Sequence, residues 1–266
     1  LGAAVVNTLS DNSLVGYWKF DEGSGTTAAD SSGSGNNGTL TSSPVWIQGK
    51  VNGALSFDGV NDYVSIPDSS SLSSIAQLSF SAWVNQSALA TAKGIASQTG
   101  TSGSDQAWSI QTGSSNSTAL RVALGTGGIG IGTTPTQSWS TGWHHVAFVY
   151  DGFQVENADR LKVYIDGVAQ FLTFNGTIPS ALQNSTRPVR IGDSYQLVRI
   201  WNGLIDEVRL YSRPLNAQEI QTLASATVSP PAPPSPPPPV SLDTLKPGEW
   251  LEIPNYRLAD CCLPIP

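Results

Sequence analysis

Short apolar runs separated by turn residues occupy the chain from residue 14 to Tyr211. Within most of these runs apolar and polar side chains alternate, which is the two-residue period of a β-strand with one buried face. The clearest runs are residues 53–59, 62–67, 78–86, 107–112, 120–125, 143–152, 160–168, 188–193 and 204–211. Roughly a dozen short strands at this spacing predict an all-β sandwich or barrel.

Two local signals add detail to this pattern. Asp166-Gly167 separates two apolar runs in "LKVYIDGVAQFL", and this dipeptide favours a two-residue β-hairpin. Residues 213–225, "RPLNAQEIQTLAS", predict one short helix. Asn216 is its expected N-cap, and Glu219 stands at the capping-box position.

The composition changes after Ala226, where eight prolines fall between residues 230 and 239. Such a run favours polyproline II at about 3.1 Å per residue and therefore a stiff spacer. We predict a lead-in over 1–11, a folded domain over 12–226, a proline-rich linker over 227–240 and a separate segment over 241–266.

The final 26 residues, 241–266, are too few to build their own core. They either begin a further domain or form an arm that docks on another surface, such as a neighbouring copy of the chain. The apolar groups that would anchor such an arm are Trp250, Ile253, Tyr256 and Leu258, and the adjacent Cys261 and Cys262 would allow cross-links.

The last predicted strand, "LIDEVRLY", contains a carboxylate among apolar residues. Alternation places Asp206 on one face with Leu204, Val208 and Leu210, and it places Ile205, Glu207, Arg209 and Tyr211 on the other. A buried carboxylate is costly unless it is neutralised, accepts backbone hydrogen bonds or binds a cation. We therefore expect one of these arrangements at Asp206.

Composition and charge exclude several classes of protein. Charged residues make up only 12% of the chain, with 26 glycines, which suits short strands joined by tight turns. The net charge is −7 and no basic stretch carries interleaved aromatics, so nucleic-acid and anionic-membrane binding are disfavoured. The chain has no apolar run long enough to span a membrane.

The compartment follows from the ends of the chain and its cysteines. The sequence contains no Met, even at residue 1, and "LGAAVVNTL" lacks a charged leader region. We expect a processed, secreted or cell-surface protein. Because the two cysteines are adjacent and near the C-terminus, the main domain has no disulfide framework.

Residues 14 to about 224 resemble the laminin-G-like, concanavalin A-type jelly rolls of secreted bacterial proteins. The resemblance rests on "LVGYWKFDEGSG", "GKVNGALSFDGVNDYVSIP", "LSFSAWV", "GWHHVAFVYDG", "LKVYIDGV" and "GLIDEVRLYSRPLNAQEI". It implies two antiparallel sheets, a short C-terminal helix, and recognition of carbohydrate or protein surfaces. Pentraxins and β-glucanases of related fold are more distant resemblances.

The same resemblance implies a structural Ca²⁺ at the aspartate of the final strand, held together with backbone carbonyls near the first strand. Asp206 matches that position. Its expected helpers are Asp21 or Glu22 in "FDEGSG" and the "FDGVND" turn, with Asp58, Asn61 and Asp62. The alternative is that Asp206 accepts backbone hydrogen bonds without a metal.

A second, ligand-binding Ca²⁺ is implied by the pentraxin resemblance. Asp105-Gln106 precedes a strand and Asp193 follows another, although the acidic loop that completes the pentraxin pattern is poor in this chain. Sugar recognition also needs exposed aromatic rings beside polar groups. Trp108, Trp139, Tyr195 and Trp201 lie at strand or loop ends and are the candidates, whereas Trp18, Trp46, Trp83 and Trp143 are expected to cover the core.

Catalysis is not indicated by any motif. Glucanases of this architecture carry spaced carboxylates along one strand, but "FDE" and "IDE" place neighbouring acids on opposite faces. The adjacent His144 and His145 also point to opposite faces and do not converge on one ion.

We therefore predict a non-catalytic module that binds a glycan or a surface, stabilised by Ca²⁺. One alternative is a structural subunit of an extracellular assembly whose C-terminal arm docks on a neighbouring copy. Another is an accessory domain of a polysaccharide-degrading enzyme.

Overall fold

The computed structural model describes residues 11–73, 76–100, 106–125, 129–194 and 198–225. The chain divides after Val228 into two units, and all described residues belong to the first. The predicted linker and the segment 241–266, with Trp250, Ile253, Tyr256, Leu258, Cys261 and Cys262, lie outside the described residues. The docking-arm hypothesis therefore stays a prediction.

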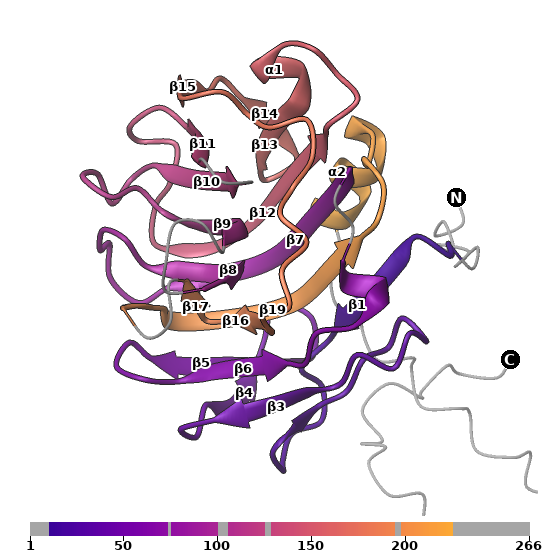
Figure 1. The fold of residues 1–266 in the computed structure, drawn as a ribbon. Coiled ribbons are helices and arrows are strands. Elements are labelled where there is room, and N and C mark those ends of the chain that lie inside the picture. The colour runs from indigo at the N-terminus through magenta and orange to yellow at the C-terminus, as the bar shows by residue number, and fades with distance from the viewer. Residues whose placement is uncertain (1–10, 74–75, 101–105, 126–128, 195–197, 226–266) are drawn as a thin grey trace, which may run out of the picture. The chain divides into compact units, whose positions relative to one another are not determined.

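Two large antiparallel sheets form the folded unit (Figure 1). Sheet A has the order β14-β13-β12-β7-β19-β5-β4, and β1 also pairs with β19. Its strands are β1 (Leu14–Trp18), β4 (Val45–Gln48), β5 (Gly53–Asp58), β7 (Gln77–Gln86), β12 (Gly142–Asp151), β13 (Leu161–Ile165), β14 (Val168–Gln170) and β19 (Asn202–Tyr211).

Sheet B has the order β15-β11-β10-β9-β8-β16-β6-β3-β2. Its strands are β2 (Thr27–Ala28), β3 (Gly38–Thr41), β6 (Tyr63–Ile66), β8 (Gly94–Thr99), β9 (Gln106–Thr112), β10 (Leu120–Gly125), β11 (Ile129–Thr133), β15 (Thr173–Asn175) and β16 (Val189–Ile191). A small hairpin, β17 (Asp193–Ser194) with β18 (Arg199–Ile200), packs against β8. The predicted two-sheet antiparallel sandwich is confirmed.

The core lies between the two sheets and is built from the inward-facing residue of each alternating pair. In β7, for example, Leu78, Phe80, Ala82 and Val84 face the core. Phe80 from sheet A, Phe148 from sheet A and Trp108 from sheet B form a three-ring contact with all ring centroids 5.8 Å apart. Aromatic burial of this kind contributes a large share of the hydrophobic stabilisation of a domain.

Both local sequence signals are confirmed. Asp166 and Gly167 have φ of 51° and 80°, the two left-handed residues that a type I′ hairpin requires, and they join β13 to β14. The helix α2 (Ala217–Ala224) begins after Asn216. The Asn216 side chain accepts a hydrogen bond from the Glu219 N–H at 3.0 Å, and the Glu219 carboxylate accepts one from the Asn216 N–H at 2.8 Å.

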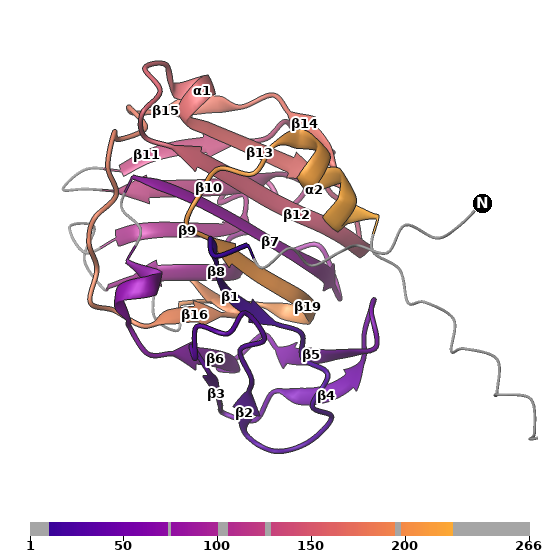
Figure 2. The same cartoon turned by 90° about the vertical axis from the view of Figure 1, so that its right-hand side faces the viewer.

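Helix α2 covers part of the outer face of sheet A, across β12 and β7 (Figure 2). Beneath it lies a second, smaller apolar cluster. This cluster contains Ala147, Val149, Tyr164, Tyr211, Leu215 and Ile220. The other helical segments are short: α1 (Asn157–Arg160) and a 3₁₀ turn at Ser70–Leu72. In the described part of the chain, no helix is long and apolar enough to cross a membrane.

Candidate functional site

Asp206 lies where strand β19 changes partners. One edge of β19 pairs with β7. The other edge pairs first with β5, over Asn202–Ile205, and then with β1, beginning at Val208. The register against β7 shifts between Asp206 and Arg209, and Glu207 takes a left-handed φ of 54°. This β-bulge places Asp206 at the gap between the end of β1 and the start of β5.

The bulge also corrects the predicted faces of this strand. Ile205, Val208 and Leu210 all face the core, so strict alternation through the strand, which grouped Leu204 with Val208, is wrong. Asp206 pairs with Trp83 of β7, on the outer side of sheet A. The expectation that it is buried is nevertheless confirmed, because its exposed fraction is 0%.

The loop between β4 and β5 covers Asp206. The Val51 N–H donates a hydrogen bond to Asp206 Oδ2 at 2.8 Å. Gly49 packs so closely that a Cβ atom there would lie 2.6 Å from Oδ2 and 2.2 Å from the Gly53 carbonyl oxygen. Any larger residue at position 49 would therefore collide with the carboxylate and the β5 backbone.

The other carboxylate oxygen of Asp206 has no partner. Oδ1 is buried and accepts no hydrogen bond within the described residues. Burial raises the pKa of Asp206 to about 7, and the negative charges of Glu207 and Asp21 add to this rise. An unpartnered buried carboxylate oxygen is the position where a cation or a proton would stabilise the fold.

Of the predicted helper residues, the structure brings Asp21 towards Asp206. Asp21 Oδ1 accepts a hydrogen bond from the Gly53 N–H at 2.8 Å. Phe20 has a left-handed φ of 60°. Its carbonyl oxygen lies so close to Gly53 that a Cβ atom added to this glycine would be only 2.4 Å from it. Glu22 is exposed and accepts from the Ala29 N–H at 2.7 Å.

The predicted helpers from the "FDGVND" turn do not gather at Asp206. Asp58 pairs with Asn202, four residues along β19 from Asp206. There Asp58 Oδ1 accepts from the N–H groups of Val60 and Asn61, and Asp62 Oδ2 accepts from the Asp58 N–H at 3.1 Å. Their assignment to the same ion as Asp206 is therefore wrong, because four residues of strand span about 13 Å.

The oxygen atoms around the gap fit a hard cation. They belong to the carboxylates of Asp206 and Asp21 and to the carbonyls of Phe20 and Gly53, and Ca²⁺ binds such combinations of oxygens. Across the residues that the structure describes, no cluster of three or more His, Cys, Asp or Glu side chains is placed to hold a metal. Backbone carbonyls would therefore have to supply much of the coordination.

The two adjacent histidines point to opposite faces, as predicted. His144 Nδ1 lies 2.7 Å from Asp166 Oδ2, and His144 Nε2 lies 2.7 Å from Ser140 Oγ. Asp166 Oδ1 also accepts from the His145 N–H at 2.9 Å. The carboxylate of the hairpin turn therefore ties β13–β14 to β12, and His144 forms part of this structural clamp.

His145 is buried on the other face with neither ring nitrogen paired among the described residues. Its ring meets the edge of Trp83 at a centroid distance of 5.5 Å. Burial lowers the pKa of His145 to about 3, and repulsion from Arg209 contributes. The folded state therefore keeps this imidazole neutral.

His145 gives a pH dependence with a definite sign. Between pH 6.5 and 3 the unfolded state binds a proton that the folded state does not, so wild-type stability should fall as the pH is lowered. Between pH 6.5 and 5, we expect the free energy of unfolding of the wild type to fall by about 1.6 kcal/mol relative to that of His145→Leu. Urea unfolding of both proteins at stepped pH measures this difference, and parallel stability curves would contradict it.

The aromatic candidates for sugar stacking are buried. Trp108, Trp139 and Trp201 all belong to the core cluster, so the prediction that they form exposed platforms is wrong. Trp139 Nε1 donates to Gln86 Oε1 at 3.1 Å, and Trp201 Nε1 donates to the Leu204 carbonyl at 3.3 Å. Tyr195 lies outside the described residues.

The predicted second calcium site is not assembled from its described members. Asp193 is fully buried and forms an ion pair with Arg190 at 2.7 Å. Asp105 lies outside the described residues, and Gln106 is described only as the first residue of β9. This leaves Asp193 without access to an exchangeable ligand.

A polar pocket of about 210 Å³ lies on the outer face of sheet B. Leu120, Val122 and Leu124 of β10 face the core, so Arg121 between them faces outward. The β17–β18 hairpin forms the other wall, where Ser97 Oγ donates to the Asp193 carbonyl at 3.0 Å. The lining residues are Thr99, Ser109, Gln111, Arg121, Ile129, Ser194 and Arg199.

Gln111 organises this pocket although it is fully buried. Its Oε1 accepts hydrogen bonds from Arg199 Nη1 at 2.7 Å and from Ser194 Oγ at 3.1 Å. Because Arg121 pairs with Gln111 across β9 and β10, both side chains lie on the same face. The sequence analysis missed these residues, although the alternation in "LRVALG" places Arg121 outward.

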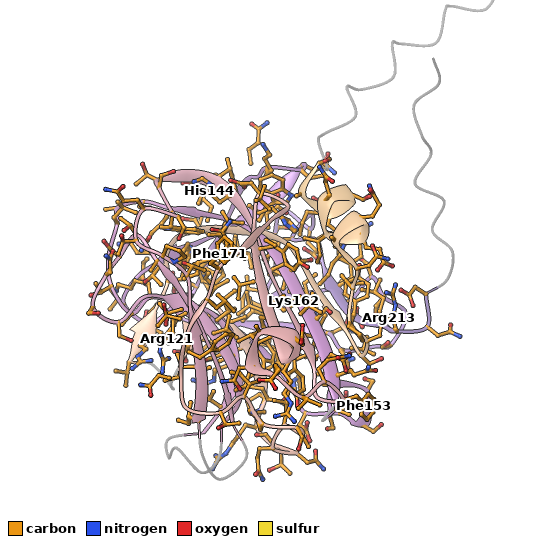
Figure 3. All side chains as sticks on the ribbon, turned by 90° about the horizontal axis from the view of Figure 1, so that it is seen from above. Arg121, His144, Phe153, Lys162, Phe171 and Arg213 are labelled. Atoms are coloured by element: carbon orange, nitrogen blue, oxygen red, sulfur yellow. The ribbon has the colours of Figure 1, made fainter. Side chains whose placement is uncertain are left out.

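A larger groove of about 840 Å³ lies on the outer face of sheet A, beside α2. The two arginines in its lining are paired with carboxylates. Arg213 bonds to both Asp11 and Glu219, and Arg209 bonds to Glu207 and to the hydroxyl of Tyr17. Figure 3 shows Arg121 and Arg213 on opposite sides of the sandwich.

Comparison with solved structures shows the same fold in binding domains. One such structure is domain 4 of an extracellular GH43 arabinanase from Geobacillus stearothermophilus, solved in complex with arabinotriose. It is 23% identical in sequence and has a TM-score of 0.57. The alignment covers 79% of this chain and 98% of that domain. The binding domain of Paraclostridial Mosquitocidal Protein 1 is 15% identical with a TM-score of 0.60, covering 81% of this chain and 52% of that one.

A third structure, Trypanosoma rangeli sialidase with the inhibitor DANA, is 19% identical with a TM-score of 0.55. It aligns with 79% of this chain, which spans only 32% of the sialidase. These likenesses are to the fold. Comparison with curated protein sequences gave no match.

The family is shown by the sequence itself. A laminin G-type family model, described as the concanavalin A-like lectin/glucanases superfamily, matches residues 57–221. This segment is more than half of the chain and runs from the end of β5 into α2. It includes the strand with Asp206 and every lining residue of the sheet B pocket. The chain belongs to the concanavalin A-like lectin/glucanase superfamily.

Proposed function

We propose that this chain is a secreted, non-catalytic carbohydrate-binding module that binds its glycan at the polar pocket on the outer face of sheet B. We propose in addition that Ca²⁺ at Asp206 stabilises the module. The observation that carries the binding proposal is the pocket itself, where hydroxyl, amide and guanidinium groups are fixed around a hollow on the outer face of sheet B.

The chemistry of the pocket suits a sugar. Thr99, Ser109 and Ser194 supply hydroxyl groups, and a saccharide is recognised by a small number of convergent donors and acceptors of this kind. Gln111 holds Ser194 and Arg199 in place before any ligand arrives, and preorganisation of this kind reduces the entropy cost of binding.

The comparisons support a binding role in two ways. The family is one of lectins and glucanases, and the arabinanase domain of similar fold was solved with a bound arabinotriose. That domain is one part of an enzyme, which favours an accessory role beside a catalytic domain as a second form of the same function.

The calcium proposal rests on the unpartnered Oδ1 of Asp206 and on the carbonyls that surround the gap between β1 and β5. An ion there would join the last strand to residues that follow the first one, Phe20 and Asp21. In this proposal Ca²⁺ holds the sandwich together and takes no part in recognising the glycan, because Asp206 belongs to sheet A and the pocket to sheet B.

The test of the binding proposal is a glycan array probed with the full chain, followed by calorimetry on the hits. We expect at least one glycan to bind, and Ile129→Glu to weaken its binding at least fivefold, because Ile129 lines the pocket and is 37% exposed. Val168→Glu is the matched control, since it adds the same charge at the exposed first residue of β14. A blank array, or equal losses in both variants, would contradict the proposal.

A further inference from the structure

Arg121 differs from the other arginines of the described chain. The guanidinium groups of Arg190, Arg209 and Arg213 pair with carboxylates, and that of Arg160 donates to two backbone carbonyls. For the side chain of Arg121, the described structure contains no hydrogen bond and no ion pair. This half-buried cation therefore has no internal counter-charge.

The pocket around Arg121 concentrates positive charge. Among its described lining residues two are arginines and none is acidic. Burial lowers the pKa of Arg121, and repulsion from Arg199 adds to the effect. A half-buried guanidinium without a counter-charge is unfavourable for the free protein, so the position of Arg121 is best explained by a ligand that supplies the missing negative charge.

The orientation of Arg199 strengthens this interpretation. Gln111 Oε1 accepts a hydrogen bond from Arg199 Nη1 at 2.7 Å, and this bond fixes the Arg199 guanidinium at the pocket. Arg121 approaches from the neighbouring strand, directly opposite Gln111 in the β9–β10 pairing. The pocket thus presents two guanidinium groups from different elements, β10 and β18.

The size of the pocket limits what enters it. Its volume of about 210 Å³ is below the roughly 300 Å³ at which pockets for whole small ligands begin. It therefore suits one charged sugar residue of a longer chain. A guanidinium group binds a planar carboxylate with two parallel hydrogen bonds, which a lysine does not reproduce.

We propose that the sheet B pocket selects acidic saccharides, and that Arg121 binds the carboxylate of a uronate or a sialate residue. This inference rests on the proposed carbohydrate-binding function and narrows its ligand class. The hydroxyl groups of Thr99, Ser109 and Ser194 are then the contacts for the ring that bears the carboxylate.

The experiment uses the full chain and matched pairs of oligosaccharides. Oligomers of galacturonate, glucuronate, mannuronate and guluronate, together with a sialylated glycan, are compared by calorimetry with their methyl esters, which keep the ring and lose the charge. At least one acid should bind at least tenfold more tightly than its ester, and its affinity should fall as salt is raised. A sulfated glycan is measured in the same way. If it binds more tightly than every carboxylate-bearing glycan, the assignment of Arg121 to a carboxylate is overturned.

Variants of Arg121 test whether this residue causes the preference for the acidic saccharide. Arg121→Gln should weaken binding of the acid by about 10- to 100-fold, the cost of a lost charge-assisted bidentate pair, and leave the ester unchanged. Arg121→Lys should restore only part of the affinity. Lys162→Gln is the charge-matched control, because Lys162 is exposed on β13 of the other sheet (Figure 3).

Stability separates a binding role from a structural one. Removing a cation that lacks an internal partner should leave the melting temperature of Arg121→Gln equal to or above that of the wild type. A destabilised Arg121→Gln would overturn the inference, because it would reveal an internal partner. Tight binding of neutral glycans alone would overturn it and leave the proposed function intact, whereas no glycan binding at all would remove both.

Discussion

Millimolar Ca²⁺ is expected to raise the melting temperature of the chain, and Asp206→Asn is expected to abolish that rise. At 100 times its dissociation constant, a ligand that binds only the folded state adds about 2.7 kcal/mol, or roughly 5 to 10 °C for a domain of this size. The physical reason is the buried Oδ1 of Asp206, which lacks a partner until an ion occupies the gap between β1 and β5. Thermal unfolding monitored by circular dichroism, with the protein first stripped by a chelator, measures the effect.

The matched control is Asp58→Asn. The sequence placed Asp58 in the same ligand set, but the structure puts it in its own turn, where it accepts from the Val60 and Asn61 N–H groups. Its substitution should leave the calcium response intact. Equal melting curves of the wild type with and without Ca²⁺ would exclude the ion, and an equal response of both variants would exclude Asp206 as its ligand.

Trp108→Ala is expected to destabilise the domain by about 3 to 5 kcal/mol, the usual cost of removing a large buried aromatic side chain. Trp108 is 1% exposed and lies within 5.8 Å of the ring centroids of both Phe80 and Phe148, so its loss opens a cavity between the sheets. Chemical denaturation at 25 °C measures the change. Phe171→Ala is the control, since a ring that is 90% exposed should cost less than about 0.5 kcal/mol.

The Trp108→Ala variant also distinguishes two roles for Trp108, packing in the core and stacking on a bound sugar. The core assignment requires that Trp108→Ala loses stability but binds glycan as the wild type does, when measured under conditions where both remain folded. A variant of wild-type stability with weakened glycan binding would show that Trp108 contacts the ligand, contrary to its place among the rings of Phe80 and Phe148.

Local signals in the sequence were sufficient for the elements that depend on neighbouring residues. The Asp166-Gly167 turn follows from the left-handed backbone that two successive residues must adopt, which Asp and Gly tolerate. The capping box of Asn216 and Glu219 likewise involves residues three apart. The alternating pattern predicted the strands for the same reason, because the period of a strand is fixed by its backbone, whereas the two-sheet packing was implied by the family resemblance.

The candidate site was only partly predictable. Burial of Asp206 was anticipated from its apolar neighbours, and the joining of the last strand to the region after the first strand was implied by resemblance. The bulge at Glu207 was not anticipated, because a bulge arises where a strand must satisfy two partners of different register. Without it, the alternation assigned Ile205 to the wrong face.

The aromatic residues show the same limit. Trp108 and Trp201 stand at strand ends in the sequence, and position along the chain says nothing of what packs above a ring. In the fold, Trp108 is enclosed between the two sheets. Burial of a side chain is a property of contacts between distant segments, so only the assembled sandwich assigned these residues to the core.

The sequence by itself determined the strand pattern, the hairpin turn, the capped helix and the family, because each depends on short-range backbone preferences or on residues read in order. The tertiary structure decided which side chains meet: Asp206 with the Gly49 loop, and Arg121 with Gln111 and Arg199. The Asp206 site combines residues up to 186 positions apart, Phe20 and Asp206. A side chain becomes buried, and its charge loses its solvent, only when such distant segments are packed together.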